Sequence, residues 1–126
     1  MKKLWTFFSL VWAGLIIYLS FVKPASIDEG ISWFENQDKL GHFIFYAILS
    51  WLLIKSFTEE IFLNRPISKG AIIAFFFGAV IELGQHFLTT DRDGNLMDAL
   101  SNGMGSMLIL ILSYNYPKIL LLNPKI

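Results

Sequence analysis

The chain has 126 residues, of which 55% are apolar and 16% charged, and its ten basic and ten acidic residues give a net charge of zero. A soluble domain carries about 45–50% apolar and about 25% charged residues, so we expect a membrane protein. The charge balance excludes a basic surface for nucleic acid. The absence of cysteine excludes disulfides, thiolate metal sites and a thiol nucleophile.

Four stretches of the chain are long and apolar enough to cross a bilayer as helices, which takes about 20 residues each. They cover residues 4–22, 40–57, 67–88 and 97–116. The connections between them are short, and three of the prolines lie at or beyond a span end, where proline stops a helix. The sequence therefore predicts an all-α fold, a single domain that forms a four-helix transmembrane bundle.

The first predicted span follows Lys2 and Lys3 and so resembles a secretory signal peptide. Its apolar run is longer than the about 7–15 residues usual in signal peptides, and no A-x-A cleavage site follows it. We expect this segment to remain in the chain as a membrane span.

Basic residues near the span ends predict the orientation, because cytoplasmic loops carry an excess of Lys and Arg. The N-terminus, the second connection and the C-terminal tail share one side and carry Lys2, Lys3, Lys55, Arg65, Lys69, Lys118 and Lys125. The other side carries Lys23, Lys39 and Arg92. We therefore predict cytoplasmic termini in a multi-pass protein of the bacterial cytoplasmic membrane.

Polar residues form a stripe on three of the predicted helices, because they recur at helical spacing. The second span carries Asp38, His42, Tyr46 and Ser50, the third Glu82, Gln85 and His86, and the fourth Asp98, Asn102 and Ser106. All three stripes lie toward the predicted outer leaflet. A charge inside the bilayer costs roughly 2.5–3.5 kcal/mol, so we expect the stripes to converge.

Small residues on the third span are spaced to support this convergence. Gly70, Ala74 and Gly78 precede Glu82 at intervals of four, and such stripes allow helices to approach closely in lipid. We expect this stripe to serve packing rather than function.

The three acidic residues of the stripes have two interpretations. Glu82, Asp38 and Asp98 could act as acid or base catalysts in a polar pocket. Alternatively, Glu82 joins two helices through hydrogen bonds, and the two aspartates cap helix N-termini.

The remaining stripe residues and two basic residues form a candidate binding set. Lys39 and Arg92 could hold a phosphate headgroup or could only anchor the helices at the membrane surface. The other members of the set, which could equally be interhelical contacts, are His42, Tyr46, Gln85 and Asn102.

A metal site is chemically possible in this region. Asp38, His42, Glu82 and Asp98 offer oxygen and imidazole ligands, which suit several divalent ions. Their spacing matches no metal motif, so the sequence predicts neither a metal nor a cofactor.

Two blocks of the sequence resemble the VanZ-like family of small membrane proteins. The first is Asp38-Lys39-Leu40-Gly41-His42-Phe43 followed by Tyr46, and the second is Glu82-x-x-Gln85 followed by Arg92, Asp98, Asn102 and Gly105. The likeness covers roughly residues 38–107, although residues 89–95 are more polar than the family's usual turn. The family is named for a protein associated with resistance to teicoplanin, so the resemblance implies a role in the cell envelope.

Two functions remain open at this point. In the first, an outer-leaflet polar pocket binds, and could modify, a lipid or a lipid-linked wall precursor. In the second, the protein is a non-catalytic scaffold or binding partner of envelope proteins. A cavity where the stripes meet would favour the first, and interlocked side chains would favour the second. A transporter is disfavoured because the sequence shows no broken helix or inverted repeat.

Overall fold

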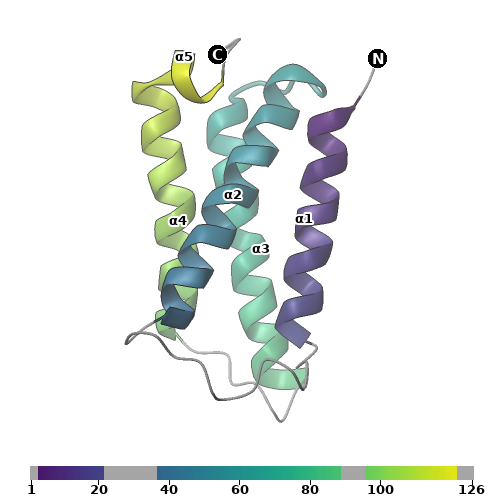
Figure 1. Cartoon of the computed structure of the whole chain (residues 1–126), viewed down its shortest axis with the longest axis vertical. Coiled ribbons are helices and arrows are strands. Elements are labelled where there is room, and N and C mark those ends of the chain that lie inside the picture. Colours follow the sequence, from purple (N-terminus) through teal and green to yellow (C-terminus); the bar gives the residue numbers. More distant parts are fainter. Residues whose placement is uncertain (1–2, 22–36, 89–95, 122–126) are drawn as a thin grey trace.

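The computed structural model describes residues 3–21, 37–88 and 96–121, although not the side chains of Gln37 and Asp38. Its helices are α1 (Leu4–Phe21), α2 (Gln37–Glu59), α3 (Pro66–Leu88), α4 (Leu96–Asn115) and the short α5 (Pro117–Leu120). Figure 1 shows α1 to α4 standing side by side as a bundle. The described part of the chain contains no strand, so the predicted all-α four-helix fold is confirmed.

The outer surface of the bundle is apolar. Each of the four long helices has the length and composition to cross a membrane. Large side chains such as Phe7, Leu10, Phe76 and Val80 are more than 50% exposed, which would be unfavourable in water over so wide an area. The chain is therefore a multi-pass integral membrane protein.

Helix α2 lies at the centre of the packing, since it contacts α1, α3 and α4. Glycines allow the closest approaches. A Cβ atom at Gly105 of α4 would collide with the backbone oxygen of Phe43 in α2, and one at Gly70 of α3 would lie 2.9 Å from the backbone nitrogen of Ile54. The predicted packing role of the small-residue stripe is thus confirmed.

The two ends of the bundle differ in what they hold. The upper end in Figure 1 holds the start of α1, the end of α2, the start of α3 and the helix α5. The lower end holds the start of α2, the end of α3 and the start of α4. The start of α1 and the end of α4 thus share one end, as a four-span topology requires. Which end faces the cytoplasm stays a prediction.

Candidate functional site

Five polar side chains from three helices meet at the lower end of the bundle. We call Lys39 and His42 of α2, Glu82 of α3, and Asp98 and Asn102 of α4 the His42 cluster. The Nδ1 atom of His42 lies 2.9 Å from Asn102 Oδ1 and 3.8 Å from Glu82 Oε1. Its Nε2 atom lies 3.6 Å from Asp98 Oδ2, and Lys39 Nζ lies 3.7 Å from Asp98 Oδ1. The predicted convergence of the three stripes is confirmed.

The cluster is largely withdrawn from the surface. The side chain of Glu82 is 7% exposed and that of Asp98 13%, whereas His42 and Lys39 are about a quarter exposed. Asp98 is in the first turn of α4, where the helix dipole stabilises a carboxylate. Because Asp98 lies inside the helix, it is not the cap residue itself. The cluster therefore has a buried acidic side, formed by Glu82 and Asp98, and a partly exposed basic side, formed by Lys39 and His42.

A second polar layer lies one helical turn deeper in the bundle. A Cβ atom at Gly78 of α3 would lie 2.9 Å from the Tyr46 ring and 3.2 Å from Asn102 Nδ2, so the glycine lets these two side chains approach α3. Both residues are buried. Among the described residues, the Tyr46 hydroxyl and Asn102 Nδ2 have no hydrogen-bond partner, and neither do the Ser50 and Ser106 hydroxyls.

Four other residues singled out by the sequence do not contribute a described side chain to the cluster. The side chain of Asp38 and the whole of Arg92 lie outside the described residues. The amide nitrogen of Gln85 donates to the carbonyl oxygen of Ser20 in α1 at 2.9 Å, so it joins α3 to α1. His86 is exposed and packs against the Phe87 ring.

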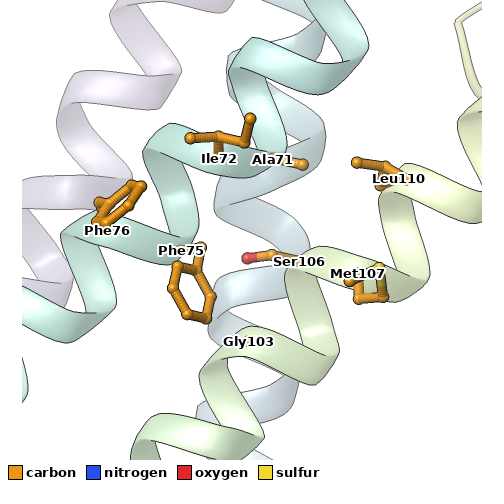
Figure 2. Close-up of a pocket in the computed structure, with 8 residues that line it drawn as sticks. All are labelled: Ala71, Ile72, Phe75, Phe76, Gly103, Ser106, Met107 and Leu110. Atoms are coloured by element: carbon orange, nitrogen blue, oxygen red, sulfur yellow. The ribbon is translucent and has the colours of Figure 1, made fainter.

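A cavity of about 260 Å³ lies between α3 and α4, nearer the middle of the bundle than the cluster. Figure 2 shows its α3 wall and its α4 wall, with the Phe75 ring directed at the α4 backbone near Gly103. The lining is Ala71, Ile72, Phe75, Phe76, Gly103, Ser106, Met107 and Leu110. This cavity is apolar apart from Ser106, unlike the polar pocket that the stripes predicted.

Buried charges also occur at the upper end of the bundle, outside the three polar stripes. We use the term Lys55 network for Lys55, Glu59 and Glu60 together with the backbone groups of Trp5, Thr6 and Leu121 that they bond. Lys55 is 1% exposed, although its place in the sequence puts it among the basic residues near the span ends. Its Nζ donates to Glu59 Oε1 at 2.6 Å and to the Leu121 carbonyl oxygen at 2.9 Å, and it lies 4.8 Å from the Trp5 ring centre. The i,i+4 spacing of Lys55 and Glu59 was the available signal.

Glu60 of the Lys55 network caps the start of α1. Its carboxylate accepts hydrogen bonds from the backbone N–H groups of Trp5 at 2.6 Å and Thr6 at 2.7 Å, two of the groups that a helix start leaves without partners. Burial acts to raise the pKa of Glu60, but the hydrogen bonds from Thr6 and Trp5 and the charge of Lys3 outweigh it. The pKa of Glu60 therefore lies below its ordinary value.

The fold and the cluster define a class: a multi-pass membrane protein with ionisable side chains buried where three helices meet. Comparison of the chain with models of protein families, with curated proteins and with solved structures found no match. Function must therefore be argued from the cluster itself.

Proposed function

We propose that this protein acts in the bacterial cell envelope, where the His42 cluster binds an amphiphile such as a lipid or a lipid-linked wall precursor. The observation that carries the proposal is the meeting of His42, Glu82 and Asp98 from three helices inside an apolar bundle. Ionisable groups at such positions are costly and are typical of substrate or ion sites.

The apolar cavity supports a ligand with an acyl chain. Gly103, at its edge, follows Asp98 by five residues on α4, which is about 7.5 Å along a helix. An acyl chain lying between α3 and α4 would then place its headgroup near the cluster. Lys39 would hold the phosphate, and Arg92, which lies outside the described residues, is the second candidate for this role.

The VanZ-like assignment and the outward orientation of the cluster remain part of this proposal. They suggest wall precursors as the substrate class and teicoplanin sensitivity as the first phenotype to measure. Glu82 and Asp98 would then serve as acid or base, and Asp38 as a third candidate.

A non-catalytic scaffold is the second candidate function. Two cross-helix hydrogen bonds favour it: His42 to Asn102, and Gln85 to the carbonyl of Ser20. Such contacts join helices in lipid whether or not a ligand binds.

Lipid analysis separates the two functions. Mass spectrometry of lipids that copurify with the wild type should show one phosphate-bearing class enriched over the membrane extract, and Glu82→Gln should lose it. The control is Lys69→Gln, which changes an exposed charge near the start of α3 and should retain the lipid. A wild-type phenotype that survives Glu82→Gln, Asp38→Asn and Asp98→Asn alike would end the catalytic proposal and leave the scaffold.

A further inference from the structure

The hydrogen bond between His42 and Asn102 determines where the imidazole carries its proton. With the Asn102 amide oriented as in the structure, its oxygen lies 2.9 Å from His42 Nδ1, and the other atom near Nδ1 is a carboxylate oxygen of Glu82. Both oxygens are acceptors, so Nδ1 carries the proton and donates it to Asn102. The Nε2 atom of a neutral His42 then presents a lone pair.

That lone pair faces a carboxylate oxygen, since Asp98 Oδ2 lies 3.6 Å from Nε2. Counting either ring nitrogen of His42, one ligand atom from each of His42, Glu82 and Asp98 lies within 4.8 Å of the other two. Among the described side chains of this cluster, two carboxylates, those of Glu82 and Asp98, face one ammonium, that of Lys39. Converging lone pairs in an apolar bundle are stabilised by a cation.

The deeper polar layer provides a second, independent observation. Tyr46 and Asn102 are 2% and 1% exposed, yet the Tyr46 hydroxyl and Asn102 Nδ2 have no partner among the described residues. The Asn102 amide already touches His42, and Gly78 brings the Tyr46 ring and Asn102 Nδ2 against α3. Buried polar groups in proteins are nearly always hydrogen-bonded, and a water on a metal ion would supply such a partner.

We propose that His42 Nε2, Glu82 and Asp98 bind a divalent transition-metal ion of the Zn²⁺ or Mn²⁺ type, with Asn102 as the residue that positions the imidazole. Mixed imidazole and carboxylate ligands suit such ions, whereas Mg²⁺ and Ca²⁺ prefer oxygen alone. Tetrahedral ligands about 2.1 Å from a metal lie about 3.4 Å apart. The three ligand atoms now lie within 4.8 Å of one another, so small side-chain movements would bring them to the spacing that a metal requires. A histidine that ligates a metal typically donates its other N–H to an oxygen, as His42 does here.

The metal would also explain how an acidic cluster could accept a phosphate headgroup. Glu82 and Asp98 repel an anion, and a bound divalent ion would reverse the sign of the site. The metal proposal uses the residues of the proposed function, but it is tested with metal alone, so each proposal can fail without the other.

The experiment uses the full chain in detergent, purified with a histidine-free tag and stripped with a chelator. Titration with Zn²⁺, read by calorimetry and by metal analysis after equilibrium dialysis, should give one ion per chain. Substitution of Co²⁺ should give the visible absorption of a site with nitrogen and oxygen ligands. Glu82→Gln, Asp98→Asn and His42→Ala should each weaken Zn²⁺ binding by at least about tenfold.

His86→Ala is the matched control, because it removes the protein's other histidine from an exposed position on α3 and should leave the affinity unchanged. Asn102→Leu should weaken binding about 10–100-fold, while Asn102→Asp keeps an acceptor for Nδ1 and should retain the ion and the Co²⁺ spectrum.

Two results would overturn the proposal. One is a wild-type chain that takes up no ion. The other is uptake that His42→Ala and His86→Ala change equally, which would indicate adventitious surface binding. Each variant is checked for a monodisperse elution profile. Zn²⁺ should also raise the thermal midpoint of the wild type but not of Glu82→Gln, so that a misfolded variant is not mistaken for a metal-free one.

Discussion

The two ends of this bundle bury charge in different ways. In the Lys55 network, Lys55 contacts a carboxylate and a backbone carbonyl, and Glu60 accepts two backbone N–H groups. In the His42 cluster, the lone pair of His42 Nε2 faces Asp98 Oδ2 at 3.6 Å, and donors in the adjacent layer have no described partner. Of the described upper-end side chains, the Thr58 and Ser113 hydroxyls are in that position, but neither belongs to the Lys55 network.

This difference separates a structural network from a binding site. A buried polar network whose members are all hydrogen-bonded rigidifies a fold, whereas one with converging acceptors is stable only with an added proton, water or ion. The Lys55 network joins α1, α2 and the segment after α4 without any ligand. The His42 cluster is the end of the molecule where a ligand would improve the electrostatics. Substitutions at the two ends should therefore have different consequences.

The largest effect on stability is expected from Lys55→Met. It removes the partner of Glu59 and of the Leu121 carbonyl, and breaking a buried ion pair costs about 3–5 kcal/mol. Because the Glu59 side chain is 23% exposed, we expect the lower value, about 3 kcal/mol, seen as a lower thermal midpoint in detergent. Lys118→Met, an exposed lysine in α5, should change the midpoint little. If Glu82→Gln at the opposite end costs as much as Lys55→Met, the two ends do not differ as argued.

A smaller loss of stability is expected from Gly105→Ala. The added methyl group would collide with the Phe43 carbonyl and lie 3.0 Å from the Ala47 nitrogen, forcing α4 away from α2. Overpacking of this kind costs typically about 1–3 kcal/mol, and it would also separate Asn102 from His42. We therefore expect a lower thermal midpoint together with weaker Zn²⁺ binding.

Gly14→Ala is the control for this substitution, because a Cβ atom at Gly14 of α1 would meet nothing within 4 Å. It should be neutral or slightly stabilising, since alanine favours a helix over glycine. Equal effects at the two glycines would show that α4 does not depend on close contact with α2.

The smallest effect is expected from Glu60→Gln, and it should depend on pH. The pKa of Glu60 is lowered in the folded protein. The contribution of the Glu60 carboxylate to the stability of the fold is therefore complete above the pKa of an unfolded glutamate, about 4.3. It is lost as the pH falls through the pKa that Glu60 has in the folded protein. Loss of this cap should cost about 1 kcal/mol at pH 7. The midpoints of variant and wild type should approach each other on acidification, and a gap that stays constant between pH 7 and pH 3 would contradict the assigned role.

The four spans, their order and the residues that converge at one end can all be predicted from the sequence. Span length follows from bilayer thickness, and His42, Glu82, Asp98 and Asn102 could be grouped because helical periodicity places residues four apart on one face. The cost of exposing charge to lipid then requires such faces to turn toward one another.

Which atoms contact one another depends on the packing of the helices and is seen in the three-dimensional structure alone. Close approach of the helices at Gly105 and Gly78 accompanies the contacts of the His42 imidazole with Asn102 and Asp98, whereas the Gln85 amide bonds to α1 instead. The burial of Lys55 could not be read from its position near a span end, because its partner Leu121 lies 66 residues further along the chain. Periodicity predicts the face on which a side chain lies, but the atoms it contacts depend on the neighbouring helix and on segments distant in sequence.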